Sequence, residues 1–215
     1  MRENILPKPM HLLVGLGNPG KAYANTRHNV GFLALEHIRR IWHFPEFTKH
    51  KRANALVARG TRADRAVLLT QPQTFMNASG NAVGALARYA KVPTKNIWVI
   101  YDDAALPFGH LRVAQNKTSG GHNGIASILA HIPDASFLRF RIGIAPMHAQ
   151  QISLDQYVLN PCTASETKLL RASFTETAAA LDLAFTDTLD RVKELFSLSK
   201  LSCIALSRGT HRVCS

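Results

Sequence analysis

The sequence predicts an α/β fold, and two observations lead to that prediction. Short apolar runs of strand length alternate with longer segments in which apolar residues recur at helical spacing, as in a sheet that helices cover. No internal repeat or low-complexity segment interrupts this alternation. With 215 residues, the chain suits one domain or two small ones and can bury a sizeable core.

The first half of the chain shows the alternation most clearly. An apolar run opens it, a helical pattern follows, and two strand-like runs come next, joined by a turn. The predicted elements are a strand at 11–16, a helix at 30–42, strands at 53–59 and 66–70 with a turn at 60–64 between them, and a helix at 77–89. In that last helix, Val83, Leu86 and Tyr89 are expected on one side.

The second half begins with a strongly apolar strand at 96–101, which ends in a pair of aspartates. A helix is expected just after the stretch "GGHNG", and a further strand at 137–144. In this strand the apolar residues face one way, while Arg139 and Arg141 face the other. Both guanidinium groups are therefore expected to reach solvent.

The last predicted element is a long helix with a clear start. Thr163 and Glu166 have the spacing of a capping box, and the helix that follows is expected to be interrupted near Asp187. Beyond it the periodicity is weak. We therefore expect a domain at 1–196 and a flexible basic tail at 197–215.

The charge balance indicates the kind of partner. The chain has 26 Lys and Arg against 14 Asp and Glu, a formal net charge of +12. The tail contributes three of these charges through Lys200, Arg208 and Arg212, which leaves +9 for the body. A body this basic favours a polyanionic partner, most often nucleic acid, and the alternative is charge that serves solubility.

The composition also favours a cytoplasmic protein. No run approaches the ~20 apolar residues of a membrane span, and the segment 1–9 lacks the apolar centre of a signal peptide. The cysteines Cys162, Cys203 and Cys214 are odd in number and widely spaced, which indicates reduced thiols rather than a disulfide framework. We expect no membrane contact.

The glycine-rich stretch "GLGNPGK" has two readings as a nucleotide loop, and both are weak. Gly15, Gly17 and Gly20 satisfy G-x-G-x-x-G, but no apolar helix follows at once and no second strand ends in an acid about twenty residues on. A phosphate loop of the G-x-x-x-x-G-K type needs Ser or Thr after Lys21, where this chain has Ala22. The turn can instead shape a cleft.

Three residues near the strand ends suggest hydrolytic chemistry. Asn18 can point its amide into a cleft, or it can be an ordinary turn residue. His28 can act as a general base if a partner fixes its tautomer, and Asp102 follows a buried strand, where a carboxylate could be that partner. The chain lacks G-x-S-x-G, H-E-x-x-H and C-x-x-C. We therefore expect a water nucleophile and no metal.

Two further asparagines stand at predicted helix starts. Asn77, in "QTFMNASG", and Asn123, in "GGHNG", can be helix caps, or their amides can bind a peptide group. Phe75 and Met76 would then line the same wall, and their alternative is the ordinary core.

Taken together, five segments in order resemble the bacterial peptidyl-tRNA hydrolase family. They are "VGLGNPGKAYANTRHNVGF", "QTFMN", "YDDAALP", "GGHNG" and "FLRFRIGI", and the likeness spans roughly Met10 to Phe196. The resemblance implies a single α/β domain of the phosphorylase/hydrolase-like kind, with a mixed, twisted sheet flanked by helices. It also implies a monomer without a metal or other cofactor, which cleaves the ester between a peptide and the 3′ ribose of tRNA.

The resemblance assigns roles to particular residues. The family's catalytic histidine falls on His28, and the aspartate that stabilises its basic form falls on Asp102. The asparagine that helps to tell blocked from free aminoacyl-tRNA falls on Asn18. Contacts to tRNA or peptide carry over to Tyr23, Phe75, Asn77 and Asn123, and a tRNA phosphate contact to Arg141.

The chain departs from the family pattern at three places. Ala105 stands where many members have a second acid, and "AQNKTS" replaces a stretch in which relatives often carry a lysine and more glycines, which leaves Arg112 and Lys117 as candidate basic contacts. The stretch "APMHAQQ" replaces a more charged loop near the cleft. An RNA-binding protein without catalysis and a nucleotide-dependent enzyme are the alternatives.

Overall fold

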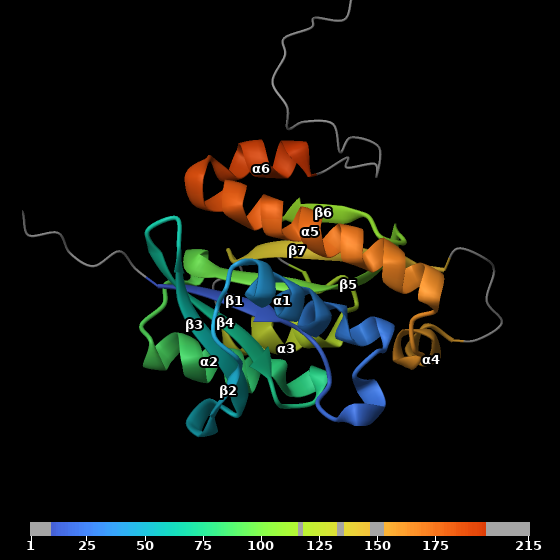
Figure 1. The fold of residues 1–215 in the computed structure, drawn as a ribbon. Coiled ribbons are helices and arrows are strands. Elements are labelled where there is room, and N and C mark those ends of the chain that lie inside the picture. The colour runs from blue at the N-terminus through green and yellow to red at the C-terminus, as the bar shows by residue number, and fades with distance from the viewer. Residues whose placement is uncertain (1–9, 116–117, 133–135, 147–152, 197–215) are drawn as a thin grey trace, which may run out of the picture.

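The fold of this computed structural model is built on one seven-stranded sheet with helices on both faces (Figure 1). The structure describes residues 10–115, 118–132, 136–146 and 153–196. The strands are β1 (His11–Gly15), β2 (Thr48–His50), β3 (Ala55–Arg62), β4 (Arg65–Pro72), β5 (Ile97–Pro107), β6 (Leu111–Ala114) and β7 (Leu138–Ala145). They lie in the order β2-β3-β4-β1-β5-β7-β6.

The sheet is mixed, as the family resemblance implies. Its centre is parallel, because β1 pairs in parallel with both β4 and β5, and β5 pairs in parallel with β7. The pairs β2–β3, β3–β4 and β6–β7 are antiparallel. The α/β prediction is therefore confirmed, and the carboxyl end of β1 lies beside Ile100, near the middle of the longer strand β5.

Six α-helices of the described residues cover the two faces of the sheet. They are α1 (Val30–Ile41), α2 (Ser79–Tyr89), α3 (Asn123–His131), α4 (Leu154–Leu159), α5 (Ala164–Thr186) and α6 (Leu189–Leu195). Helices α1, α5 and α6 pack on one face, and α2 and α3 on the other (Figure 1). None of the described helices combines the length and the apolar character that crossing a bilayer demands.

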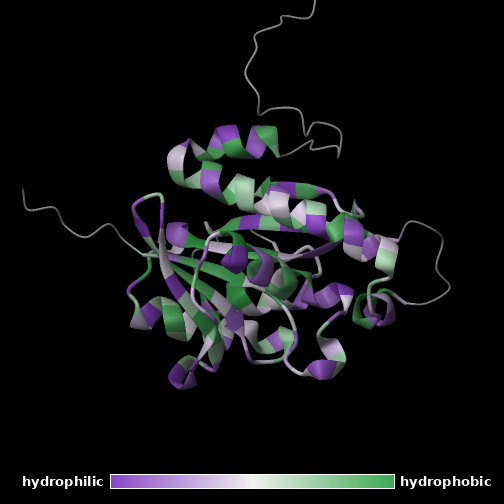
Figure 2. Cartoon of the chain, viewed as in Figure 1, coloured by the Kyte–Doolittle hydropathy of each residue, from purple (hydrophilic) through white to green (hydrophobic). Residues whose placement is uncertain are grey.

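Each face of the sheet has its own hydrophobic core. The alternation of β1 divides its side chains between them, since Leu13 joins the core under α1 and α5, while Leu12 and Val14 join the core under α2 and α3. Hydropathy follows the same layers, with apolar residues concentrated on the central strands (Figure 2).

Several predicted boundaries were wrong. Strands β3 and β4 run further than expected and meet at Ala63 and Asp64, whose φ angles of 49° and 55° form a tight two-residue turn in place of the predicted loop at 60–64. Strand β5 continues past its aspartates to Pro107. Tyr89 is 66% exposed, although it was expected beside Leu86, because its ring packs against His50 at the surface.

The prediction that both arginines of β7 reach solvent was also wrong. Arg139 is fully buried, because the loop before α3 crosses this face of the strand and its Thr118 carbonyl accepts from the Arg139 guanidinium at 2.5 Å. Arg141 is only 17% exposed at its side chain, and it forms an ion pair with Asp103.

The capping box is confirmed. The Thr163 hydroxyl accepts from the Glu166 amide, and the Glu166 carboxylate accepts from the Thr163 amide at 2.7 Å. Helix α5 ends at Thr186, and α6 begins at Leu189, so the interruption near Asp187 is confirmed as well. The predicted tail at 197–215, the candidate Lys117 and most of "APMHAQQ" lie outside the described residues.

Candidate active site

The carboxyl end of β1 and the middle of β5 bring the predicted base and its partner together. His28 lies on a short 3-10 turn, Arg27–Asn29, between β1 and α1, and Asp102 lies on β5. His28 Nδ1 is 2.9 Å from Asp102 Oδ2 and 3.1 Å from Oδ1. Asp102 is 3% exposed, so this carboxylate depends on its protein partners for hydrogen bonds.

Glycines allow α1 to start almost against the sheet. A Cβ on Gly31 would lie 2.4 Å from the Ile100 carbonyl oxygen, and one on Gly15 would lie 2.3 Å from the Gly31 carbonyl oxygen. Side chains at these positions would therefore push the first turn of α1 away from β1 and β5. The preceding turn, which carries His28, would move with it.

The histidine turn is tied to the glycine-rich turn by a pair of hydrogen bonds. The side-chain Oδ1 of Asn29 accepts from the Asn18 backbone N–H at 2.8 Å, and its Nδ2 donates to the Asn18 backbone carbonyl at 2.9 Å. One side chain thus satisfies both backbone groups of Asn18 and fixes the distance between the two turns.

A buried ion pair holds the other side of the histidine turn. Arg27 donates to both oxygens of Glu166, and its remaining nitrogen donates to the carbonyls of Tyr157 and Asn160. The two charged side chains are only 8% and 6% exposed. Removing one partner of such a pair typically costs about 3–5 kcal/mol, so this contact fixes the turn firmly to α4 and α5.

The surroundings of His28 shift its pKa in opposite directions. Burial on its own lowers the pKa of His28, but the charge and hydrogen bond of Asp102 raise it above its ordinary value of 6.5. Burial would raise the pKa of Asp102, yet the two facing imidazoles hold it well below its ordinary range. Within the described part of the chain, no hydrogen bond reaches the other ring nitrogen of His28, Nε2.

The second imidazole belongs to His122, which the sequence analysis did not single out. Its Nε2 is 3.2 Å from Asp102 Oδ1, and its Nδ1 accepts from the Gly124 and Ile125 backbone N–H groups at the start of α3. The only sign of a functional role for His122 in the sequence is its place in "GGHNG", next to Asn123. Helix capping by His122 also excludes Asn123 as the cap.

These three side chains are also the one group among the described residues that could hold a metal ion. One ligand atom from each of His28, Asp102 and His122 lies within 4.8 Å of the others. His28 Nδ1 and His122 Nε2 each lie at hydrogen-bond distance from the Asp102 carboxylate. A cation bound through these two nitrogens would have to displace the protons that they share with the carboxylate, so the arrangement fits a hydrogen-bonded group better than a metal site.

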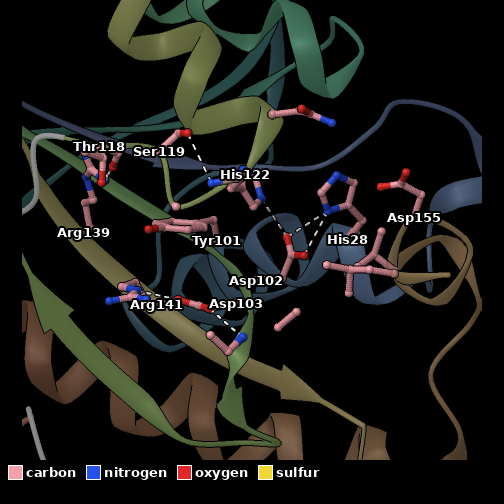
Figure 3. Close-up of a pocket in the computed structure, with 17 residues that line it drawn as sticks. His28, Tyr101, Asp102, Asp103, Thr118, Ser119, His122, Arg139, Arg141 and Asp155 are labelled. Carbon is pink, nitrogen blue, oxygen red and sulfur yellow. Dashed lines mark hydrogen bonds and ion pairs between the residues drawn. The ribbon is translucent and has the colours of Figure 1, made fainter. Parts of the chain in front are cut away.

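The three residues line one end of a cavity of about 380 Å³ (Figure 3). Arg139 and Arg141 lie at the other end, and Tyr101 packs on His122 between the two ends (Figure 3). Helix α4 lines the cavity beside His28 with Leu154, Asp155 and Val158. Arg141 donates through Nε to Asp103, and within the described residues its two terminal nitrogens donate no hydrogen bond. The cavity therefore has an imidazole end and a basic end.

The remaining predicted residues divide between this cavity and a neighbouring surface. Asn123 is exposed and lines the cavity. Asn18 is buried and lies outside the lining, with its Oδ1 accepting from the Met76 backbone N–H at 2.8 Å. Its Nδ2 donates no hydrogen bond within the described chain, so one polar group of the amide remains available.

An aromatic pair stands beside the Asn18 turn. The rings of Tyr23 and Phe75 meet edge to face with centroids 6.4 Å apart. Phe75 is 61% exposed, which excludes the reading as ordinary core, whereas Met76 is buried. Asn77 is exposed within a short 3-10 turn and caps no helix.

The geometry of the glycine-rich turn disfavours a nucleotide loop. Gly20 has a φ of 105°, and a 3-10 turn follows at Lys21–Tyr23. Helix α1 begins only at Val30, so no long helix presents its N-terminus to this turn. The phosphate cradle of a dinucleotide site needs that helix.

Comparisons with known proteins agree with the resemblance seen in the sequence. The sequence profile of the family described as peptidyl-tRNA hydrolase matches residues 12–202. The peptidyl-tRNA hydrolase of Brevibacillus brevis is 42% identical over 157 residues, which cover 73% of this chain and 82% of that protein. That of Methylocella silvestris is 42% identical over 174 residues, which cover 81% and 87%.

Solved structures show the same likeness in three dimensions. A crystal structure of a peptidyl-tRNA hydrolase in complex with N-propanol superposes with a TM-score of 0.82 at 27% identity, covering 90% of this chain and 97% of that one. The peptidyl-tRNA hydrolase of Acinetobacter baumannii superposes with a TM-score of 0.80 at 27% identity, covering 87% and 94%.

Proposed function

The chain belongs to the peptidyl-tRNA hydrolase family, and from this premise we propose how its residues cleave the ester between a peptide and the 3′ ribose of tRNA. The relatives support a hydrolase and not the alternative of an RNA-binding protein without catalysis. The released tRNA returns to translation. The observation that carries the mechanism is the His28–Asp102 pair at the end of the cavity, in which Nε2 of His28 has no hydrogen bond to any residue that the structure describes.

His28 is the general base of the proposed first step. Asp102 accepts a hydrogen bond from the Nδ1–H group, so the lone pair of the neutral ring is on Nε2, where the attacking water would bind. Nε2 removes a proton from this water as the oxygen attacks the ester carbonyl. Asp102 stabilises the imidazolium that forms and stays ionised itself.

The tetrahedral intermediate needs hydrogen-bond donors for its oxyanion. Asn18 fits this role because its Oδ1 is occupied by Met76 N–H, which leaves Nδ2 as a donor of fixed orientation. The exposed amide of Asn77 is the second candidate. One such donor is worth roughly 3 kcal/mol in comparable sites. When the intermediate collapses, His28 returns its proton to the 3′ oxygen of the ribose.

The basic end of the cavity would receive the nucleic acid. Arg141 can bind a tRNA phosphate through its terminal nitrogens while Asp103 holds its Nε. Asn123 can bind the substrate next to His122, and the aromatic pair of Tyr23 and Phe75 can stack on a base or an apolar side chain together with Asn77.

Other expectations remain proposals on the same basis. We propose that the enzyme acts as a monomer without a metal or other cofactor, and that its hydrolase domain spans 1–196 with a separate tail at 197–215. The odd number and wide spacing of the cysteines favour the cytoplasm.

Substrate discrimination tests this function directly. The protein is offered N-acetylated and free aminoacyl-tRNA, and deacylation of each is followed. We expect rapid release of tRNA from the acetylated substrate and little from the free one. Binding of both substrates without release of tRNA would overturn the proposal.

A further inference from the structure

The ring of His122 has a single tautomer that the fold imposes. Its Nδ1 accepts the backbone N–H groups of Gly124 at 3.1 Å and Ile125 at 3.3 Å. A nitrogen that accepts hydrogen bonds carries no proton, so the proton of the neutral ring is on Nε2. His122 therefore donates to Asp102 Oδ1, which lies 3.2 Å away.

The ring cannot turn away from this arrangement. It packs edge to face on Tyr101, with centroids 4.8 Å apart, and its side chain is only 10% exposed. A Cβ on Gly124 would come within 3.1 Å of His122 Cε1, so the chain is also tight on that side. The start of α3 thus sets the direction of one N–H donor towards the carboxylate.

Asp102 consequently stands between two imidazoles that use opposite nitrogens. It accepts from His122 Nε2 on one side and from His28 Nδ1 on the other (Figure 3). We propose that His122 is a positioning residue of the reaction, which fixes the orientation of Asp102 from the start of α3 and through it the tautomer of His28. This inference rests on the proposed function for its activity measurements, whereas its NMR measurement does not depend on that function.

The variant Asp102→Asn tests whether His122 sets the orientation of the side chain at position 102. An amide has one acceptor and one donor, and the fixed N–H of His122 requires the acceptor. The NH₂ group then takes the place of Oδ2, which at 2.9 Å is the oxygen nearer to His28 Nδ1, while the amide oxygen takes the place of Oδ1, 3.1 Å from the same nitrogen. Because the nearer group is now a donor, we expect Nδ1 to accept from it and the proton of His28 to move to Nε2. That proton blocks the lone pair which activates water, so kcat should fall, although much less than when His28 is removed, because the other tautomer of the ring stays accessible.

Removing the His122 donor should partly undo this damage. His122→Asn keeps an acceptor for the start of α3, because Asn is a good helix cap, but its shorter side chain no longer reaches Asp102. In the double variant with Asp102→Asn, the amide at 102 can turn its oxygen to His28. We expect the double variant to be roughly tenfold more active than Asp102→Asn alone, although His122→Asn by itself lowers kcat/KM by about two- to a hundredfold.

A direct readout comes from the nitrogen and proton NMR spectra of the histidine rings. In the unaltered protein the proton of neutral His28 should be on Nδ1 and that of His122 on Nε2. In Asp102→Asn the proton of His28 should move to Nε2, and in the double variant it should return. If His28 keeps Nδ1–H in Asp102→Asn, the positioning role of His122 is wrong, whatever the activity.

The controls separate this inference from loss of structure and from the proposed function. His50→Asn is the matched control, because His50 also caps a short helix through Nδ1, accepting from Ala53 N–H at 3.3 Å, but away from the cavity. It should leave activity unchanged. His122→Leu, which offers no donor, should rescue Asp102→Asn in the same direction. If the activity loss of the double variant is simply the product of the losses in the two single variants, the inference is wrong. If the proton of His28 moves to Nε2 in Asp102→Asn without a change in rate, the role of His28 as base is wrong instead.

Discussion

Asp102 and Asp103 are neighbours on β5 and line the same cavity, yet their surroundings differ in kind. Asp102 is 3% exposed and faces two imidazoles, whereas Asp103 is partly exposed and faces the guanidinium of Arg141 (Figure 3). Asp103 also accepts the Ala105 backbone N–H at 2.9 Å. The alternation of the strand sends the two carboxylates in different directions.

The difference shows that the partner decides what a carboxylate can do. An imidazole gains and loses a proton near neutral pH, so Asp102 can influence proton transfer. A guanidinium stays charged, so Asp103 can only set the position and net charge of Arg141. We expect variants at the imidazole end to alter chemistry on every substrate, and variants at the basic end to matter only when the tRNA is present.

The largest expected effect is at the imidazole end. His28→Ala should lower kcat by at least the 10²–10⁴-fold that general-base catalysis typically supplies, equally on full peptidyl-tRNA and on a truncated ester. The fold and tRNA binding should stay nearly intact. His37→Ala, which removes a surface histidine bonded to Thr175, is the control and should have near-normal activity. Near-normal turnover in His28→Ala would refute the assignment.

The pH dependence should separate the two carboxylates next. Because Asp102 raises the pKa of His28, the acid limb of kcat/KM should have its midpoint above 6.5, and the rate should rise with pH through it. Asp103→Asn should leave this midpoint in place. A midpoint below 6.5, or one that moves with Asp103, would contradict the separation of the two ends.

The same shift has the opposite effect on stability. A histidine whose pKa is raised by folding stabilises the protein fully below the unfolded value, and this contribution is lost as pH rises through the folded value. The contribution of His28 to the free energy of unfolding should therefore fall over the pH range in which the rate rises. Denaturant titrations between pH 5.5 and 8.5 would measure it, and His28→Ala should abolish this component.

At the basic end the expected effect depends on the substrate. Arg141→Ala should weaken binding of full peptidyl-tRNA and reduce its salt slope by roughly one, because one phosphate contact is lost. Turnover of a truncated ester should stay close to normal. Arg59→Ala, an exposed charge on β3, is the matched control. Equal losses on both substrates would mean that Arg141 supports the cavity itself.

The smallest effect is expected for Asp103→Asn. The amide oxygen can still accept from Arg141, but the site loses one negative charge. The KM for peptidyl-tRNA should therefore fall a few-fold at low salt, and the difference should fade at high salt. A raised KM would instead show that the carboxylate charge is needed to hold Arg141 in place.

Local patterns in the sequence were enough to predict much of this fold. The strand at β1, the helix α1 and the capping box of α5 all follow from periodicity or from residues three apart. Strands β2 and β6 are too short, at three and four residues, for their patterns to be distinguished from loops. The pairing of His28 with Asp102 was predictable because Asp102 follows a strongly apolar run, and a carboxylate at such a place needs a partner.

Other features depend on contacts that no local pattern encodes. Arg139 is buried because the loop at Thr118, 21 residues earlier, folds over it, and His122 reaches Asp102 because that loop leads into α3. From the sequence alone, Arg139 and His122 would both be predicted to be exposed polar residues. The capping Glu166 was predicted, but its second role as the partner of Arg27 was not.

The ion pair between Arg27 and Glu166 joins positions 139 residues apart and holds the turn that carries His28. During synthesis on the ribosome, Arg27 emerges long before Glu166 exists, so the turn that carries His28 lacks its link to α4 and α5 until most of the chain has been made. A growing polypeptide is itself an ester of tRNA, the kind of bond that the finished protein cleaves. The nascent enzyme therefore carries an incomplete site until its final third has folded against its beginning.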